Sequence, residues 1–119
     1  MKLIIAGGRD FNDKQLMIDT LNKLVQEGNI PECPELICGM ARGADMTAYS
    51  LWVEHNMPVH TFFADWDRFG NSAGYRRNVA MAIAGDTLVA FWDGKSKGTE
   101  HMINIMTRYK DKQVFVVRY

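Results

Sequence analysis

Glycine and hydroxyl residues fill a short turn between an apolar run at residues 87–92 and a helical pattern that opens at Gly98 and Thr99. The other residues of this turn that could contact a ligand are Asp93, Gly94 and Ser96. Backbone N–H groups at a helix start are unpaired and carry the positive end of the helix dipole, so they suit a phosphate. Glycine lets a ligand approach the backbone closely. An ordinary strand–turn–helix connection uses the same residue types, so this turn alone leaves both interpretations open.

Two more glycine-rich turns, residues 7–11 and 39–45, follow short apolar runs. The candidate binding residues in them are Gly7, Gly8, Arg9, Asp10, Gly39, Arg42 and Gly43. Each turn is a weak signal by itself, because glycine is common wherever a strand passes into a helix. Only a fold that brings the turns together would make them one site.

The charged residues of these turns each have more than one role open to them. We expect Arg9 to contact a phosphate, and Asp10 to contact a ribose hydroxyl or a neighbouring turn, although Asp10 could also cap its own loop. Arg42 could clamp phosphate or pair with Asp45, with no preference between the two. Asp45 stands early in a predicted helix, where its charge is expected to complement the helix dipole.

Residues 64–74 show no regular period, which predicts a loop that is long for a compact domain and therefore functional or mobile. Trp66 and Phe69 could stack on a base or pack as a lid over the core. The helix predicted at residues 73–84 carries further candidates. Its polar residues in the first two turns are Arg76, Arg77 and Asn78.

Neighbouring residues on a helix point about 100° apart, so one of Arg76 and Arg77 should reach the ligand while the other faces solvent. Arg76 is the candidate ligand contact. Asn78 is a second candidate, which could hydrogen-bond a base or support a loop. His101, in the last predicted helix, could act as an acid or base near neutral pH, but a structural role is expected of it.

Alternating strands and helices would position these residues. Buried apolar runs predict five strands, at residues 3–6, 36–38, 59–63, 87–92 and 114–117. Helical spacing predicts four helices, from an N-cap at Asn12 to a stop at Gly28, from the second turn to about residue 55, over residues 73–84, and from Gly98 to about residue 109. This alternation predicts an α/β fold, a Rossmann-like doubly wound parallel sheet with helices on both faces.

A Rossmann-like strand order of 3-2-1-4-5 would place a ligand crevice between strands one and four, at the carboxyl ends of the strands. The three glycine-bearing turns follow strands one, two and four, so they would meet at that crevice. Their convergence predicts a nucleotide or another phosphate-bearing ligand.

Length and composition limit the class of protein. The 119 residues are 47% hydrophobic and 24% charged, which is typical of one globular domain spanning residues 1–119. Fourteen basic and fourteen acidic residues give no net charge, which argues against a large nucleic-acid footprint. The two cysteines, Cys33 and Cys38, do not have zinc-site spacing, so no metal and no cofactor are expected. With no secretory signal or membrane span in the sequence, a cytoplasmic protein is expected.

Four motifs occur in order along the chain. They are Gly-Gly-Arg-Asp-Phe at residues 7–11, Gly-x-x-x-Gly-Ala-Asp at 39–45, Ala-Gly-x-Arg-x-Asn at 73–78 behind the aromatic segment 66–70, and Asp-Gly-x-Ser-x-Gly-Thr-x-His at 93–101. Together they resemble the SLOG superfamily, most closely its small single-domain YspA-like branch, over nearly the whole chain. The resemblance implies a Rossmann-like fold whose glycine-rich turns hold a nucleotide or a nucleotide-derived ligand.

The resemblance leaves the choice between enzyme and binding protein open. Related phosphoribohydrolases, the "lonely guy" enzymes, carry a Gly-Gly-x-Gly-Thr-x-x-Glu motif whose Glu acts in cleaving the N-glycosidic bond. Here Gly98 and Thr99 match, but Met102 stands at the Glu position and Glu100 lies on another side of the helix. Arg76 or Arg77 could match the catalytic Arg of those enzymes, but its acidic partner is missing. No catalytic residue is therefore assigned.

Three functions remain in competition. The preferred one is a sensor, carrier or sequestering protein for an ADP-ribose-like or cyclic nucleotide signal. The alternative is a nucleoside 5′-monophosphate phosphoribohydrolase, with Glu100, Asp10 or Asp93 replacing the missing carboxylate. A DNA-binding module, as in the transformation protein of the same superfamily, is disfavoured by the neutral charge. We expect a homo-oligomer, a dimer or a tetramer. The chain has eight methionines and three tryptophans, and members of the superfamily that it resembles commonly pair through helices.

Overall fold

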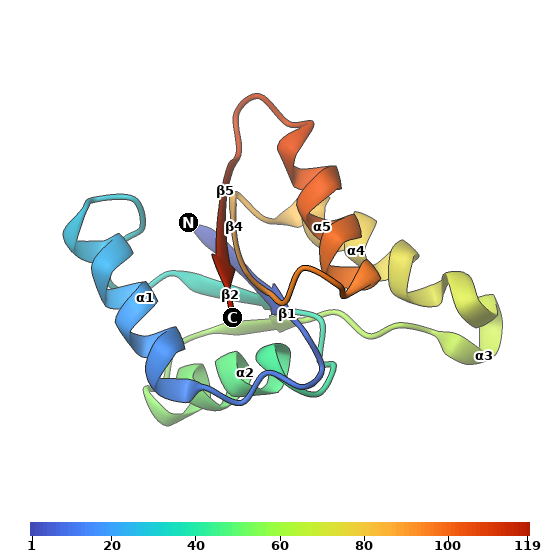
Figure 1. The fold of residues 1–119 in the computed structure, drawn as a ribbon, viewed down its shortest axis with the longest axis horizontal. Coiled ribbons are helices and arrows are strands. Elements are labelled where there is room, and N and C mark those ends of the chain that lie inside the picture. The colour runs from blue at the N-terminus through green and yellow to red at the C-terminus, as the bar shows by residue number, and fades with distance from the viewer.

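The computed structural model describes residues 1–119 and contains a five-stranded, all-parallel sheet in the order β3-β2-β1-β4-β5 (Figure 1). The strands are β1 (Lys2–Gly7), β2 (Glu35–Cys38), β3 (Val59–Thr61), β4 (Thr87–Trp92) and β5 (Gln113–Arg118). The helices are α1 (Lys14–Gln26), α2 (Ala44–Glu54), α3 (Trp66–Phe69), α4 (Ala73–Ala84) and α5 (Lys97–Thr107), with a 3-10 turn η1 (Gly70–Ser72). The predicted α/β fold class and strand order are confirmed.

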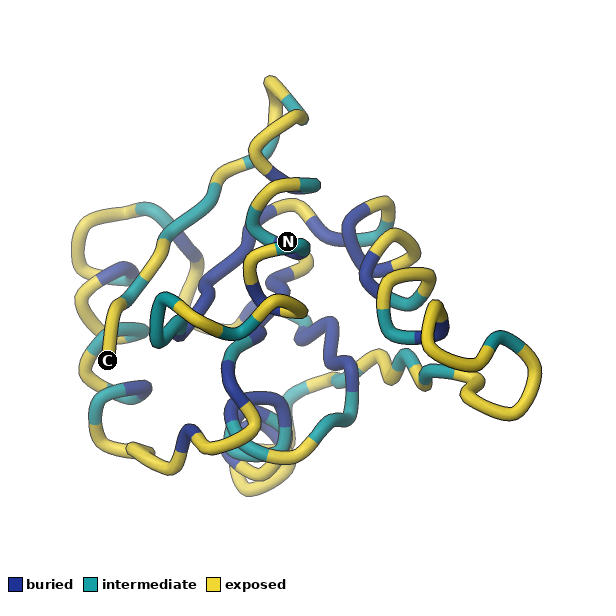
Figure 2. The backbone as a smooth tube through the Cα atoms, turned by 45° about the vertical axis from the view of Figure 1, so that its right-hand side comes forward, coloured by how far each residue is buried: buried dark blue, intermediate teal, exposed yellow.

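Helices cover both faces of the sheet, with α1 and α2 on one face and α4 and α5 on the other (Figure 1). Alternate residues of β1 serve the two sides, because side chains along a strand point to opposite faces. Leu3 and Ile5 pack with α1 and α2, while Ile4 and Ala6 pack with α4 and α5. The two central strands, β1 and β4, are therefore apolar and buried over residues 3–6 and 88–91, and Figure 2 shows buried chain at the centre of the molecule.

The first helix begins one residue later than the sequence predicts. Asp13, not Asn12, is the N-cap, because its Oδ1 accepts a hydrogen bond from the backbone N–H of Leu16 at 2.9 Å. The predicted stop at Gly28 is confirmed. That residue has φ +76°, a left-handed conformation that suits glycine after a helix.

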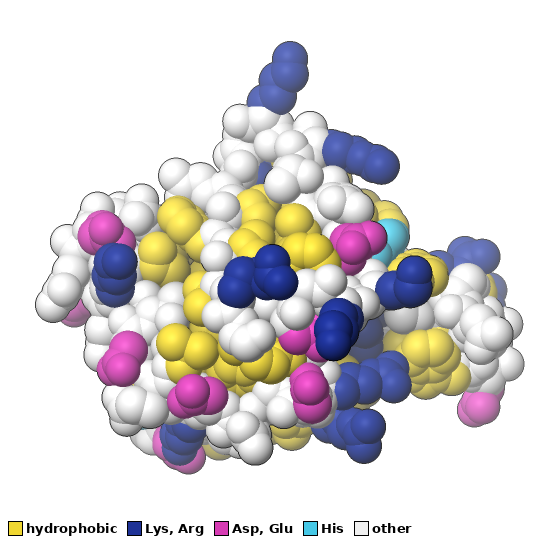
Figure 3. All heavy atoms as spheres, in the orientation of Figure 1, with side chains coloured by type: hydrophobic (Ala, Val, Ile, Leu, Met, Phe, Trp, Pro, Cys, Tyr) yellow, Lys and Arg dark blue, Asp and Glu magenta, His cyan; other side chains and the backbone are white.

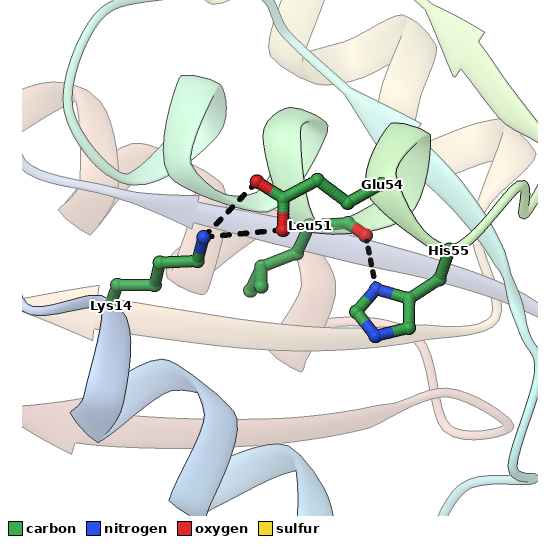
Figure 4. Close-up of polar contacts among 4 residues, drawn as sticks. All are labelled: Lys14, Leu51, Glu54 and His55. Atoms are coloured by element: carbon green, nitrogen blue, oxygen red, sulfur yellow. Dashed lines mark hydrogen bonds and ion pairs between the residues drawn. The ribbon is translucent and has the colours of Figure 1, made fainter.

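An ion pair joins α1 to α2 on the outer side of this layer (Figure 4). The Nζ of Lys14 lies 3.1 and 3.2 Å from the two carboxylate oxygens of Glu54. Both side chains are about half exposed, so the pair stabilises the fold by at most about 1 kcal/mol. Nδ1 of His55 lies 2.8 Å from the carbonyl oxygen of Leu51 at the end of α2. These contacts lie at the start of α1 and the end of α2.

The segment predicted as an irregular loop contains a short helix, α3, and η1. Asp65 caps α3 by accepting a hydrogen bond from the N–H of Arg68 at 3.1 Å, a signal too local to stand out in an aperiodic stretch. The preceding strand ends at Thr61 rather than at residue 63, and Phe63 beyond it is 72% exposed. α3 buries no side chain and lies at the far right of Figure 1, away from the sheet. No helix of the structure combines the length and the apolar character that crossing a bilayer requires.

Candidate functional site

A cavity of about 490 Å³ opens at the carboxyl ends of the strands, where the turns after β1, β2 and β4 meet α4. Its lining residues are Ala6, Gly7, Gly8, Arg9, Asp10, Ala41, Arg42, Asp45, Trp66, Asn71, Gly74, Tyr75, Arg77, Asn78, Met81, Asp93, Ser96, Gly98, Thr99 and Met102. Figure 3 shows Lys and Arg side chains gathered to the right of centre, with carboxylates beside them. The convergence of the three turns expected from the strand order is present in the structure.

Ten of the fourteen residues selected from the sequence line this cavity. They are Gly7, Gly8, Arg9, Asp10, Arg42, Asn78, Asp93, Ser96, Gly98 and Thr99. The other four, Gly39, Gly43, Arg76 and Gly94, do not line it. The three glycines among those four lie next to the cavity residues or the turns that carry them. Because they have no side chain, neighbouring backbones and side chains can approach one another closely there.

Gly43 shows how the turns are held together. It has φ +85°, and a Cβ there would collide with the carbonyl oxygen of Gly8 and lie 2.7 Å from Arg9 Cα. The next residue, Ala44, donates its N–H to the carbonyl oxygen of Gly8 at 3.2 Å. The start of α2 is thereby fixed directly against the turn after β1.

The start of α5 has two open backbone donors. Ser96 is the N-cap, and its Oγ lies 3.0 Å from Thr99 Oγ1 and accepts from the N–H of Thr99 at 3.4 Å. The N–H groups of Lys97 and Gly98 make no hydrogen bond within the protein. A Cβ at Gly98 would meet nothing within 4 Å, so the space beside this helix start is open.

Asp93 shapes the turn that precedes α5. Its Oδ1 accepts the N–H groups of Lys95 and Ser96, both at 2.8 Å. The hydrogen bond from the N–H of Ser96, followed by that from Lys95, lowers the pKa of Asp93 below its ordinary value. Its role is therefore to hold the turn in shape while its charge is satisfied by backbone donors.

Of the two neighbouring arginines of α4, Arg77 lines the cavity and Arg76, the candidate from the sequence, does not. Arg76 turns away, with Nε 3.1 Å from Ser72 Oγ and its guanidinium 4.3 Å from the centre of the Phe69 ring. Arg77 lines the cavity and donates from Nη1 to the carbonyl oxygen of Gly39 at 3.0 Å. Its Nε is buried and has no hydrogen-bond partner.

Asp45 is the second residue that the structure adds. It lines the cavity although it is only 6% exposed, and its Oδ2 accepts the N–H of Ala41 at 3.1 Å. Burial raises the pKa of this carboxyl to about 6. The role expected from the sequence, complementing the helix dipole, does not account for this burial.

Asn78 and His101 connect α4 with α5. Nδ2 of Asn78 donates to the carbonyl oxygen of Gly98 at 3.1 Å and lies 3.2 Å from Nδ1 of His101. The ring of His101 packs on Tyr75 with 4.4 Å between centroids, and burial lowers the pKa of His101. Asn78 is 5% exposed, so it supports the start of α5, which is the loop-supporting role left open by the sequence.

Asp10 is held by an aromatic residue from β5's end. The hydroxyl of Tyr119 donates to Oδ1 of Asp10 at 2.7 Å, and a Cβ at Gly8 would collide with that hydroxyl. Burial raises the pKa of Tyr119, and its hydrogen bond to Asp10 raises it further. No local pattern predicts this contact, because the two residues are 109 positions apart in the chain.

Two apolar residues complete the cavity. Trp66 is 48% exposed and lies over Gly74, where a Cβ would be 3.3 Å from the indole ring. Met102 is 1% exposed and reaches the cavity from α5, whereas Glu100 is exposed and does not line it. The structure contains no group of three His, Cys, Asp or Glu side chains that could hold a metal ion.

Comparison with known proteins gives two matches. A family model described as the YspA, cpYpsA-related SLOG family matches residues 1–69. The gene 61 protein of Mycobacterium phage D29 is 33% identical over 106 residues, which cover 84% of this chain and 83% of that protein. No solved structure matches the chain significantly.

Proposed function

The chain belongs to the YspA, cpYpsA-related SLOG family, and we propose that its cavity binds a nucleotide or a nucleotide-derived small molecule. Membership of this family is consistent with nucleotide-related binding or processing. The protein would act as a sensor, carrier or sequestering protein for an ADP-ribose-like or cyclic nucleotide signal. The observation that carries the proposal is the start of α5, where the N–H groups of Lys97 and Gly98 are unpaired and Gly98 lines a cavity that Arg9 and Arg42 also line.

The phosphate of such a ligand would lie against the start of α5. The N–H groups of Lys97 and Gly98 have no protein acceptor, and the helix dipole favours an anion at this end. Gly98 leaves the approach free of side-chain atoms. Arg9 and Arg42 line the same cavity and would supply positive charge to it.

The base would lie against Trp66. This indole is half exposed at the cavity, and an indole face offers a stacking surface for a purine ring. The cavity volume of about 490 Å³ falls within the range typical of small-molecule sites. A nucleotide monophosphate or a compact dinucleotide-like signal is therefore the size class that the site suits.

Binding without cleavage is the preferred activity because of Met102. Cleavage of an N-glycosidic bond builds positive charge on the ribose, which a nearby carboxylate stabilises. Related phosphoribohydrolases have Glu where this chain has Met102, and a thioether neither carries charge nor accepts a proton at neutral pH. Glu100 lies outside the cavity lining and does not supply the missing group.

One observation favours the alternative, a nucleoside 5′-monophosphate phosphoribohydrolase. Asp45 lines the cavity, and burial raises its pKa to about 6, which suits a general acid or base near neutral pH. Asp10 also lines the cavity, but Tyr119 already occupies one of its oxygens. An assay for released base separates the two functions.

The proposal is tested by equilibrium dialysis of AMP and of ADP-ribose against the parent protein and two variants. Gly98→Val should fold, because its side chain enters open space, and should weaken AMP binding at least about tenfold by blocking phosphate from the helix start. Glu100→Gln is the matched control on the same helix turn and should bind as the parent does. Equal binding by Gly98→Val and the parent would place the ligand elsewhere.

Incubation with AMP, ADP-ribose and cyclic ADP-ribose isomers then tests turnover. The bound compound should be recovered unchanged, with no free base by chromatography. Rapid release of adenine by the parent would overturn the binding function and establish the phosphoribohydrolase. Loss of that release in Asp45→Asn would then identify the carboxylate that replaces the missing Glu.

A further inference from the structure

Asp45 has one carboxylate oxygen without a partner. Oδ2 accepts the N–H of Ala41, but Oδ1 makes no hydrogen bond in the protein. Oδ1 is not among the buried polar atoms that lack a partner, and its residue lines the cavity, so this oxygen is open to the cavity. A side chain that is 6% exposed thus presents a single free acceptor to a bound ligand.

Three elements surround Asp45, and two of them contribute a positive charge. Arg77 of α4 and Arg9 of the turn after β1 are near enough to act on its charge, and Cys38 of β2 donates its Sγ–H to the backbone carbonyl of Asp45 at 3.4 Å. Neither arginine forms an ion pair with it within 4.0 Å. Buried carboxylates are ordinarily paired or fully hydrogen-bonded, so this one lacks a partner that a ligand could supply.

For a nucleotide ligand, the missing partner is a neutral hydrogen-bond donor. A phosphate would bring a second negative charge against the carboxylate, so the anionic part of the ligand must lie elsewhere, at the start of α5. A hydroxyl of the sugar and an amino group of the base are the neutral donors that a nucleotide carries. Both would satisfy Oδ1 with a charge-assisted hydrogen bond.

Resting on the proposed function, we propose that Asp45 is a specificity-determining residue that accepts a hydrogen bond from a neutral donor of the nucleotide, either a ribose hydroxyl or the amino group of the base. Arg77 and this carboxylate both lie against Gly39, without a hydrogen bond between them. Nη1 of Arg77 is fixed on the carbonyl of Gly39, and a Cβ at Gly39 would lie 2.9 Å from Asp45 Oδ2 and 3.2 Å from Arg77 Nε. The absence of a side chain at Gly39 therefore lets both groups approach the end of β2.

The experiment measures the Kd of AMP, 2′-deoxy-AMP, 3′-deoxy-AMP and IMP for the parent, Asp45→Asn and Asp111→Asn. The first two analogues each remove one hydroxyl, and IMP replaces the amino group by a carbonyl. Asp111 is exposed and makes no hydrogen bond, so its variant controls for loss of one negative charge. Circular dichroism confirms that the variants are folded.

The parent should bind one of the three analogues about tenfold or more weaker than AMP, because a hydrogen bond to a charged group is lost. In Asp45→Asn the ratio of the Kd of this analogue to the Kd of AMP should fall severalfold. The analogue should also bind the variant more tightly than it binds the parent, because the variant has no buried charge left without a partner. The analogue that binds more weakly than AMP identifies the group that Asp45 contacts, a ribose hydroxyl or the amino group of the base. Asp111→Asn should keep the parent ratios.

Two results would overturn the inference. If the parent binds AMP and all three analogues equally, or if Asp45→Asn discriminates among them as the parent does, Asp45 does not select the ligand. The proposed nucleotide site is unaffected by either result. If neither AMP nor ADP-ribose binds the parent at all, the proposed function fails and this inference fails with it.

Discussion

The buried carboxyl of Asp45 should make the stability of the protein depend on pH. Its pKa is raised from the ordinary 3.8 to about 6 by burial, so the folded state holds its proton more tightly than the unfolded state does. A group of this kind contributes stability that is fully present below its unfolded pKa and is lost as pH rises through its folded pKa. The loss therefore develops between about pH 4 and pH 6 and is complete near pH 7.

The size of the effect follows from the shift. Two pKa units correspond to roughly 3 kcal/mol of unfolding free energy, since each unit is about 1.4 kcal/mol. Asp45→Asn keeps the shape of the side chain and an oxygen for the Ala41 N–H, but it carries no charge at any pH. The variant should therefore match the parent at pH 4 and exceed its stability by up to about 3 kcal/mol at pH 7.5.

Urea unfolding followed by circular dichroism, in phosphate-free buffers from pH 4 to 8, measures the difference directly. Subtracting parent from variant cancels the other titrating groups. Asp111→Asn, at an exposed carboxylate, should show no such divergence. Parallel stability curves for the parent and Asp45→Asn would refute the reasoning, because they would mean that Asp45 ionises without penalty in the folded state.

Three further predictions follow from the geometry. Arg77→Met should weaken AMP binding at least about tenfold in dialysis while Arg76→Met binds as the parent does, because only Arg77 lines the cavity; equal losses would contradict the assignment. Thr99→Val should cost about 1 kcal/mol in urea unfolding through loss of the Ser96 contact, and an unchanged midpoint would show that this contact contributes nothing. The protein should be a dimer or tetramer by light scattering, paired through the exposed apolar stripe Tyr75, Val79 and Ile83 of α4, and Ile83→Asp should dissociate it; a monomeric parent at high micromolar concentration would contradict this.

The fold could be predicted from the sequence because its strands are buried on both faces. Runs such as Leu88 to Phe91 are apolar at every position, which marks a parallel strand covered by two helix layers. The alternation of strands with helices then limits the possible strand orders to a few. The order β3-β2-β1-β4-β5 brings the glycine-rich turns together. These are local patterns combined with one topological rule.

The remaining features of the site depend on tertiary contacts that leave no local pattern. Whether Arg76 or Arg77 faces the cavity depends on how α4 is rotated about its axis relative to the sheet. The sequence of α4 alone does not settle that rotation. Asp45 is buried because Gly43 lets α2 pack on the turn after β1. α3 has only four residues, so it shows no periodicity, and only its cap at Asp65 could have revealed it.

The central claim is that a nucleotide phosphate binds at the start of α5, and amide resonances measure this most directly. In a ¹H–¹⁵N spectrum titrated with AMP and with ADP-ribose, the N–H signals of Lys97 and Gly98 should shift saturably and by more than any others in the chain, because they are open donors beside the cavity. Signals of α1 and of the last turn of α2, near Glu54, should stay unchanged. Saturable shifts confined to those two segments, or no saturable shift with either compound, would contradict the account.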